Sequence, residues 1–213
     1  MTEFKNINAV PEPSLRRLPV YRDYLKKVKN EGGKFISCTQ ISEALNLIAV
    51  QIRKDLAFTG IVGKPKVGYD IDELLASLDN FLGLNNTTEA FLVGAGNLGT
   101  ALLSYEGFDT CGLHIIAAFD NDLSKIGREI NKKKILPIEK FQNLTKRMKI
   151  NIGIMAVPAG EAQKTADLMI NSGIKAIWNF TSAKISAPEK IIIQHENFAA
   201  SFLVLSKKLK GLL

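Results

Sequence analysis

Three glycines at a characteristic spacing are the residues of this chain best suited to chemistry. They lie in the run Gly94-Ala95-Gly96-Asn97-Leu98-Gly99, which follows an apolar segment, residues 90–93, and opens a predicted helix, residues 97–106. In a GxGxxG loop the first glycine permits a tight turn, the second leaves room for a pyrophosphate, and the third lets the helix pack on the strand. The N-terminus of such a helix offers free N–H groups to the phosphates. The pattern therefore predicts a dinucleotide-binding loop over these six residues.

An acidic residue follows at the distance that this kind of site requires. Asp120 ends the next apolar segment, residues 113–119, and comes about 20 residues after the glycines, where a carboxylate can accept both hydroxyls of the adenosine ribose. The same charge repels a 2′-phosphate, so Asp120 favours NAD(H) over NADP(H). The alternative is that Asp120 only caps the segment that follows it, together with Asp122.

Two further pairs of residues lie at the ends of later predicted strands. Val157-Pro158 follows one strand, and Asn179-Phe180 ends another. Because ligands bind at the carboxyl ends of the strands in a doubly wound sheet, these pairs are candidates for contacts with a nicotinamide. Asn179 could bond a carboxamide and Phe180 could pack against a ring. The alternative is that they are ordinary strand ends and core residues.

The elements that must position these residues alternate along the second part of the chain. Strands are predicted at residues 90–93, 113–119, 150–157, 175–180 and 190–194, and helices at residues 97–106, 122–130, 137–147 and 160–171. Strands that alternate with helices indicate βαβ units and a mainly parallel sheet. A last amphipathic helix is predicted over residues 197–212, with an apolar stripe of Phe198, Phe202, Leu205, Leu209 and Leu212.

The first part of the chain has the outline of a helix-turn-helix. Residues 14–30 have helical spacing, and because proline is tolerated in a first turn, we expect this helix to begin near Pro19. A cap at residues 37–39 opens a short helix, and a tight turn at residues 47–49 leads to another helix at residues 50–58. Two helices joined by a tight turn are typical of DNA-binding domains.

The side chains of the helix at residues 50–58 suit a nucleic acid. Gln51, Arg53 and Lys54 lie near its beginning, the part of a recognition helix that reaches base edges in the major groove. The apolar residues at four-residue spacing are expected to pack inward; they are Ile48, Ile52 and Leu56. The alternative is a small three-helix adaptor with a solvated charged face.

A candidate wing follows, and the basic charge of the chain is concentrated in this region. The segment from Gly63 to Tyr69 reads as a turn that carries Lys64 and Lys66, which could touch phosphates or the minor groove. The net charge is +7, and residues 1–69 hold 12 basic and 6 acidic side chains, whereas residues 70–84 hold four acidic and no basic ones. The position of this excess favours a polyanionic partner more than its total does.

Several classes of protein are disfavoured by composition. The two cysteines, Cys38 and Cys111, match neither a disulfide framework nor a metal-ligand spacing. We find no signal peptide and no apolar stretch that would span a bilayer, and therefore expect a cytoplasmic protein without a membrane partner. His114 lies at the start of a strand, the wrong end for this site, His195 reads as structural, and no tyrosine has a lysine four residues later. We therefore assign no catalytic residue and no metal.

Taken together, these motifs resemble the redox-sensing transcriptional repressor Rex family of Gram-positive and related bacteria. The resemblance covers residues 14–206 and rests on Arg17-Leu18-Pro19, residues 51–56, Gly68-Tyr69, residues 94–99, Phe119-Asp120, residues 156–158 and Asn179-Phe180. It implies an α/β protein with a winged helix-turn-helix domain and its connector helix at residues 1–84. A Rossmann domain with a doubly wound parallel sheet would follow at residues 85–196, and a dimerisation helix at residues 197–213.

The resemblance also implies a function and an assembly. Such a protein is a homodimer that binds palindromic operator DNA when NAD⁺ is abundant and releases it when NADH accumulates, and its terminal helix swaps into the partner subunit. Arg53 and Lys54 would contact bases or phosphates, and Lys64 and Lys66, near Tyr69, would serve the wing.

A further set of residues matches positions that the family links to the NAD⁺/NADH switch. They are Arg17, Tyr105 and Asn197, of which the last stands where the family has an aspartate. Asparagine can form hydrogen bonds but no ion pair. The resemblance therefore implies a softer switch, the use of another acid such as Glu196, or a different redox sensitivity.

Two other functions are left open by the residues alone. The first is an NAD-dependent oxidoreductase, against which the missing acid/base group counts. The second is a CoA-binding module of the Rossmann type, against which Asp120 counts, since a carboxylate that binds a ribose diol has no obvious use with a 3′-phosphorylated ligand.

Overall fold

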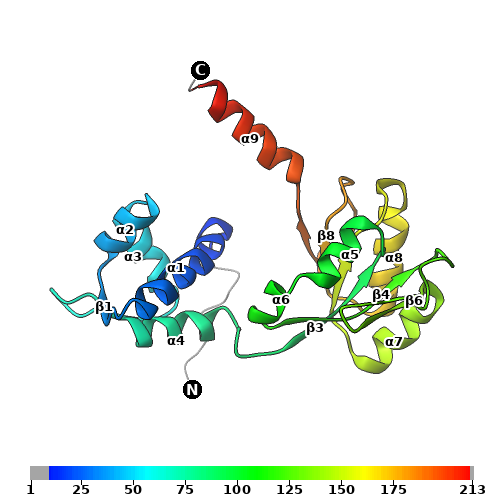
Figure 1. Cartoon of the computed structure of the whole chain (residues 1–213), viewed down its shortest axis with the longest axis horizontal. Coiled ribbons are helices and arrows are strands. Elements are labelled where there is room, and N and C mark those ends of the chain that lie inside the picture. The colour runs from blue at the N-terminus through cyan, green and yellow to red at the C-terminus, as the bar shows by residue number, and fades with distance from the viewer. Residues whose placement is uncertain (1–9, 212–213) are drawn as a thin grey trace. The chain divides into compact units, whose positions relative to one another are not determined.

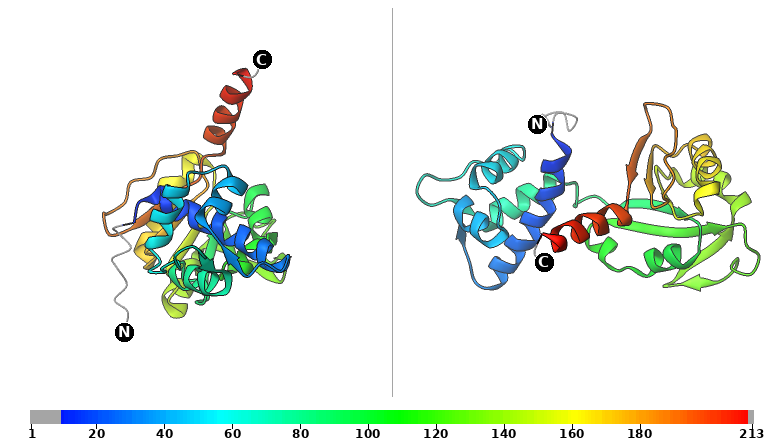
Figure 2. Two further views of the ribbon diagram at one scale, coloured as in Figure 1. Left: turned by 90° about the vertical axis from the view of Figure 1, so that its left-hand side faces the viewer. Right: turned by 90° about the horizontal axis from the view of Figure 1, so that it is seen from above.

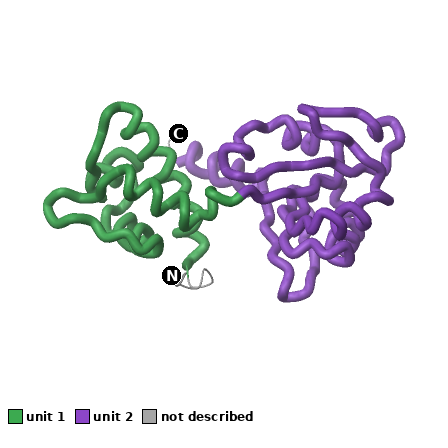
Figure 3. Tube along the Cα trace, turned by 90° about the horizontal axis from the view of Figure 1, so that it is seen from below, with its two compact units in different colours: residues 1–86 green, residues 87–213 purple. Residues whose placement is uncertain are grey.

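The structure is a computed structural model that describes residues 10–211, and it divides into two compact units (Figures 1 and 3). Residues 1–86 form unit 1 and residues 87–213 form unit 2. Each unit has a hydrophobic core of its own, so each is described by itself.

Unit 1 is a small helical domain with one two-stranded sheet. Its elements are α1 (Glu12–Asn30), β1 (Phe35–Ile36), α2 (Cys38–Leu45), α3 (Ala49–Ala57), β2 (Tyr69–Asp70) and α4 (Ile71–Phe81). The two strands pair in antiparallel fashion, with Phe35 opposite Asp70. Apolar side chains from all four helices form the core, including Leu18, Tyr21, Ile41, Ile52, Leu56 and Leu74. This arrangement is the winged helix-turn-helix that the sequence predicts.

The first helix begins earlier than predicted. We expected its start near Pro19, but α1 begins at Glu12, with Pro13 in the first turn, and Pro19 lies inside it. Pro13 therefore takes the first-turn place that we had assigned to Pro19. A proline inside a helix removes one backbone hydrogen bond, but Pro19 is exposed, so water can reach the carbonyl left without a donor.

The tight turn between α2 and α3 follows from local chemistry. Ser37 caps α2 by accepting a hydrogen bond from the Gln40 N–H at 3.2 Å, and the Gln40 side chain accepts one from the Ser37 N–H at 2.8 Å. Asn46 ends the helix in the left-handed region, with φ of 52°. The prediction that Ile48 packs inward is wrong: it precedes the first turn of α3 and is 68% exposed.

Unit 2 contains a seven-stranded sheet in the order β5-β6-β4-β3-β7-β8-β9. The strands are β3 (Thr88–Val93), β4 (Leu113–Asp120), β5 (Glu129–Ile130), β6 (Lys133–Pro137), β7 (Ile152–Met155), β8 (Ala176–Asn179) and β9 (Ile192–His195). All neighbours pair in parallel except β5 and β6. Without β5 this is the strand order of the Rossmann fold, in which the order reverses between β3 and β7.

Helices cover both faces of this sheet (Figure 1). They are α5 (Asn97–Ser104), α6 (Gly107–Thr110), α7 (Phe141–Met148) and α8 (Ala162–Ser172), with short 3₁₀ turns at Ile138–Lys140 and Ala159–Glu161. Along β3, Ala90 and Leu92 join the core cluster that contains Leu103 of α5, whereas Phe91 joins the cluster of α7 and α8. This alternation confirms a doubly wound sheet with two cores.

One predicted helix of this unit is wrong. Residues 122–130 form turns and the short strand β5 instead of a helix, and the hairpin of β5 and β6 was not predicted. The Asp120 carboxylate accepts from the Asp122 N–H at 2.9 Å, and the Asp122 carboxylate accepts from the Ser124 N–H at 2.9 Å. Such local bonds satisfy the backbone in turns and compete with a helix.

The terminal helix α9 (Phe198–Lys210) stands clear of the sheet and of the helices that pack on it (Figure 2). None of its described side chains is buried. Its exposed large apolar residues are Phe198, Phe202, Leu203, Val204, Leu205 and Leu209. Leu212, the last residue of the predicted stripe, lies outside the described residues. Between residues 10 and 211 no helix is both long and apolar enough to cross a bilayer.

Candidate nucleotide site and nucleic-acid interface

The glycine loop follows β3 and opens α5, and each glycine is required for a different reason. Gly94 has φ of +96°, and a Cβ there would lie 2.4 Å from the Ala156 carbonyl oxygen beyond β7. A Cβ on Gly99 would lie 1.9 Å from the Gly94 carbonyl oxygen, so only glycine lets α5 approach the loop. A Cβ on Gly96 would meet no atom within 4 Å. Close packing therefore requires glycine at positions 94 and 99. Gly96 instead borders open space, where a pyrophosphate can approach the backbone.

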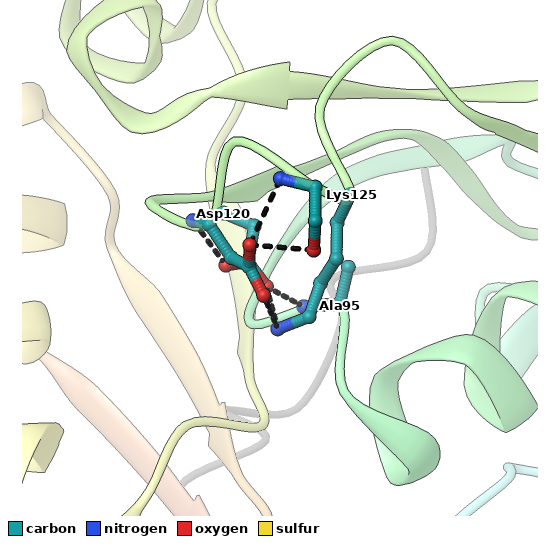
Figure 4. A network of polar contacts seen from close by, with 5 residues as sticks. Ala95, Asp120 and Lys125 are labelled. Carbon is teal, nitrogen blue, oxygen red and sulfur yellow. Dashed lines mark hydrogen bonds and ion pairs between the residues drawn. The ribbon is translucent and has the colours of Figure 1, made fainter.

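The carboxylate of Asp120 ties this loop to the end of β4 (Figure 4). Its Oδ2 accepts a hydrogen bond from the Ala95 N–H at 2.7 Å, and its Oδ1 accepts one from the Asp122 N–H at 2.9 Å. The Nζ of Lys125 lies 3.2 Å from Oδ2. Asp120 is only 6% exposed, and these partners compensate the burial of its charge.

Lys125 joins two carboxylates on one turn. Its Nζ also lies 3.4 Å from Oδ2 of Asp122. Desolvation lowers the pKa of Lys125, but the hydrogen bond and charge of Asp120 outweigh it, so the pKa is raised. The pKa of Asp122 is lowered, chiefly because the Ser124 hydroxyl donates to it. The sequence did not indicate Lys125 as a site residue, because its role depends on two carboxylates whose positions are known only from the structure.

A cavity of about 480 Å³ opens above the point where the strand order reverses. Its lining includes five of the predicted residues, which are Gly94, Gly96, Asp120, Val157 and Pro158, and several polar ones that the sequence did not indicate, which are Asn121, Lys125, Glu161, Lys164 and Thr165. The rest of the glycine run is not among the lining residues. The cavity size is ordinary for a small-molecule site. The open space at Gly96, the carboxylate at the end of β4 and the N-terminus of α5 fit an adenosine diphosphate with a free 2′-hydroxyl.

Asn179 and Phe180 lie elsewhere in unit 2. The Asn179 side chain is fully buried: its Nδ2 donates to the Ala183 carbonyl at 3.0 Å and lies 2.9 Å from Nδ1 of His195, and its Oδ1 accepts from the Thr181 N–H at 2.9 Å. This side chain therefore ties β8 to β9 and to the loop after β8. A contact with a nicotinamide carboxamide stays a prediction.

A row of aromatic rings connects the end of α5 with the start of α9. Tyr105 lies 4.9 Å from Phe108, Phe108 5.5 Å from Trp178, Trp178 4.8 Å from Phe180, and Phe180 6.1 Å from Phe198, measured between ring centroids. Just before α9, Oε1 of Glu196 accepts a hydrogen bond from the Trp178 indole N–H at 3.0 Å. Asn197 caps α9 by accepting from the Ala200 N–H at 3.0 Å.

In unit 1, a buried carboxylate joins α1 to α3. Asp55 binds Arg17 through two hydrogen bonds of 2.7 and 2.9 Å, and it accepts the Tyr21 hydroxyl at 2.7 Å. Burial raises the pKa of Asp55, but the bonds from Arg17 and Tyr21 outweigh it and the pKa is lowered. Burial and Asp55 raise the pKa of Tyr21. The Gln51 amide also reaches Arg17, at 3.2 Å, so α3 presents Gln51 to α1.

Arg53 and Lys54, in contrast, are exposed on α3. The wing turns at Lys64, Pro65 and Lys66, and the Gly68 N–H donates to the Lys64 carbonyl at 2.9 Å. A cavity of about 590 Å³ lies between this turn, Arg53 of α3 and the first turn of α2.

Two residues hold the wing against the rest of unit 1. A Cβ on Gly68 would lie 2.3 Å from the Ile36 carbonyl oxygen, so the wing lies directly against β1. Tyr69 is half-buried beneath the wing, and burial, with the Cys38 thiol, raises its pKa.

Among residues 10–211 there is no group of three or more His, Cys, Asp or Glu side chains that could hold a metal.

Two family models match the chain, one in each unit. A CoA binding domain matches residues 85–183, and a putative DNA-binding protein N-terminus matches residues 9–57. The redox-sensing transcriptional repressor Rex of Treponema denticola is 46% identical over 91% of this chain and 92% of that protein. The Rex protein of Bacteroides fragilis is 42% identical over 97% of this chain and 94% of that protein.

Solved structures agree with these relatives. RSP in complex with β-NAD⁺ and operator DNA has a TM-score of 0.90 and 35% identity, covering 97% of this chain and 94% of that one. RSP with β-NADH has a TM-score of 0.87 and 34% identity, covering 97% and 96%.

A winged helix-turn-helix combined with a Rossmann domain defines a ligand-responsive DNA-binding regulator. The identity to the relatives extends over nearly the whole length of both chains. The chain therefore belongs to the Rex family of redox-sensing transcriptional repressors, and it is a repressor rather than an enzyme.

Proposed function

We propose that this repressor binds operator DNA through unit 1 and NAD(H) through unit 2, and that NADH releases it from DNA. The observation that carries the proposal is the cavity at the strand-order reversal, with Gly96 facing open space and Asp120 fixed at its edge. It is supported by the relative solved with β-NAD⁺ and operator DNA and, separately, with β-NADH.

In this proposal the glycine run binds the pyrophosphate and Asp120 binds the adenosine ribose. The Gly94 N–H donates to the Phe119 carbonyl and the Ala95 N–H to Asp120, so the N–H groups proposed to bind the phosphates are those from Gly96 to Gly99, at the N-terminus of α5. Oxygen lone pairs of Asp120 that are not used by Ala95 and Asp122 accept the ribose hydroxyls. Val157 and Pro158 line the same cavity and flank the nucleotide, whereas contacts from Asn179 and Phe180 to the nicotinamide end remain predictions.

In unit 1 the DNA-binding residues divide into two groups. Arg53 and Lys54 on α3 are proposed to contact bases or phosphates in the major groove, with Gln51 beside them. Lys64 and Lys66 on the wing are proposed to contact the backbone or the minor groove, with Tyr69 supporting the wing from below. Phosphate contacts release counterions, so operator affinity should fall as the salt concentration rises.

Coupling between the two ligands is a difference in affinity between two states of the protein. NADH must have a higher affinity for the state that is unable to bind DNA than for the DNA-binding state. A hundredfold weakening of operator binding by NADH corresponds to a coupling free energy of about 2.7 kcal/mol. We assign the switch to Arg17, Tyr105 and Asn197. In the described structure Arg17 binds Asp55 and Asn197 caps α9, so a switch through them exchanges existing bonds for new ones.

We also propose that the protein is a homodimer that pairs through a swapped α9 and acts in the cytoplasm. The six exposed apolar side chains of α9 support this, because monomeric proteins rarely leave such a stripe in water. A two-fold dimer presents two α3 helices and therefore matches a palindromic operator. The segments assigned to these roles are residues 1–84, 85–196 and 197–213.

The test is a titration of the full-length protein on operator duplex, with NAD⁺ and NADH added separately. NADH should raise the Kd for DNA at least tenfold, and NAD⁺ should leave it within twofold. Gly96→Ala places a methyl group in the space kept for the pyrophosphate, so DNA binding should persist without the NADH response. Lys146→Ala, at an exposed position of α7 that does not line the cavity, is the control and should respond normally. Equal release by both nucleotides would contradict the proposal.

A further inference from the structure

The outward face of α3 carries a branched apolar residue beside two cations. Val50 is 59% exposed, and Arg53 and Lys54 follow it at three and four residues, which places all three on one face of the helix. The opposite face is fully used, because Ile52 and Leu56 are buried in the core. The exposed face is therefore the one that α3 offers to a partner.

Gln51, the polar residue next to Val50, lies at the edge of that face and is directed toward α1. Its amide lies 3.2 Å from the Arg17 guanidinium, which Asp55 holds with two hydrogen bonds. A glutamine reads adenine through its oxygen and its nitrogen together. The amide orientation that satisfies both side chains has the Gln51 oxygen accepting from Arg17, and in that orientation Gln51 cannot make the pair of contacts with adenine.

The positions of Val50 and Gln51 determine which residue in the first turn of α3 can recognise a DNA base. Residues near the beginning of a recognition helix contact base edges in the major groove, and of the four bases only thymine presents a methyl group there. Two cations on the same face bring the helix to DNA by charge complementarity. Val50 then has one apolar partner on the base edges, the 5-methyl of thymine.

We propose that Val50 is a specificity-determining residue that reads a thymine methyl group in the operator, in place of adenine reading by Gln51. This inference rests on the proposed DNA-binding function of unit 1. Removing one methyl group from such a contact is expected to weaken binding about fourfold. The phosphate contacts of the lysines are unaffected, so the change should be independent of salt concentration.

The test removes the thymine 5-methyl group from the DNA and the two γ-methyl groups of Val50 from the protein in turn. A duplex is selected from a random pool by the full-length wild-type protein, and each thymine is then replaced by deoxyuridine, which lacks only the 5-methyl. Fluorescence anisotropy should show about a fourfold loss of wild-type affinity at one position of each half-site. Val50→Ala removes the contact from both half-sites of the proposed homodimer, so it should bind the thymine duplex about sixteenfold more weakly, and it should not distinguish thymine from deoxyuridine at that position.

A matched control separates this effect from a general loss of apolar surface. Val20 on α1 is also an exposed valine, at 49%, and Val20→Ala should discriminate as the wild type does. If Val50→Ala still discriminates, or if no thymine is sensitive in the wild type, the inference is wrong while the proposed function stands. If the wild-type protein selects no duplex, the proposed function itself fails and the inference falls with it.

Discussion

Two buried aspartates, one in each unit, are bound in different ways. Asp55 is 2% exposed, and side chains of another helix, Arg17 and Tyr21, take its oxygens in the interior of unit 1. Asp120 is nearly as buried, but its partners are the backbone N–H groups of two loops and the partly exposed Lys125 at the edge of a cavity.

This difference separates a structural carboxylate from one that can bind a ligand. The partners of Asp55 are long side chains that reach it from α1, so its charge serves to hold α3 at a fixed angle to α1. The partners of Asp120 approach from the loop side, and the cavity side stays open to a hydroxyl donor. Burial alone therefore does not distinguish the two roles, whereas the direction from which the partners come does.

The largest expected effect is the loss of Asp55. Asp55→Ala leaves Arg17 and Tyr21 without their acceptor in the interior, and breaking a buried pair in this way costs about 3–5 kcal/mol of unfolding free energy. Circular dichroism in a urea titration follows both units, whereas the fluorescence of the sole tryptophan, Trp178, follows unit 2. The variant should therefore unfold at a lower urea concentration by circular dichroism, whereas the transition followed by Trp178 fluorescence should stay unchanged.

The matched control for this change is Asp23→Ala, since the Asp23 side chain is 77% exposed. It should cost less than about 0.5 kcal/mol. A loss below about 1 kcal/mol for Asp55→Ala would show that the Arg17 pair is not structural.

The same carboxylate predicts a pH dependence that is confined to unit 1. The pKa of Asp55 is lower in the folded protein than its ordinary value of about 3.9. Its contribution to stability is therefore complete above that value and is lost as the pH falls through the folded pKa. Asp55→Asn should be less stable than the wild type by about 2–3 kcal/mol at pH 7, and this difference should shrink progressively as the pH falls below the ordinary pKa of the carboxyl group. A constant difference from pH 7 to pH 2 would contradict this.

Compared with the loss of Asp55, the loss of Asp120 should lower the free energy of unfolding less and the affinity for NADH more. Asp120→Ala removes the proposed acceptor of the ribose hydroxyls, and hydrogen bonds to a charged group are worth about 2 kcal/mol, or about thirtyfold in the Kd for NADH. The Kd is measured by titration of NADH fluorescence. Asp122→Ala, on the same turn but more exposed, should change it less than about threefold. Equal losses in both variants would remove the distinction between the two carboxylates.

Most of the architecture could be predicted because local patterns and packing agree. The spacing around Gly94, Gly96 and Gly99 defines a strand, a turn and a helix, and the structure has all three. The helix-turn-helix is similarly local, since Ser37 and Asn46 cap α2 at either end.

The predictions from sequence were wrong where residues distant in the chain determine the local conformation. In the acidic turn after Asp120, backbone N–H groups donate to the carboxylates, which Lys125 also contacts, and no periodicity in the sequence distinguishes this turn from a helix. The side chain of Gln51 faces away from the exposed side of α3 because Arg17 lies beside it, a residue 34 positions earlier in the chain. Sequence spacing identifies the residue types on α3 but not the partner that holds each one.

The bond from the Ala95 N–H to Asp120 also bears on how fast the protein can respond. It fixes the glycine loop in its turn before any nucleotide arrives, so binding requires little rearrangement of the backbone. Association rates fall when a partner must first change shape, and here that delay is small at the pyrophosphate. The response to a rising NADH concentration is then limited by how often the nucleotide reaches the site rather than by the ordering of the glycine loop.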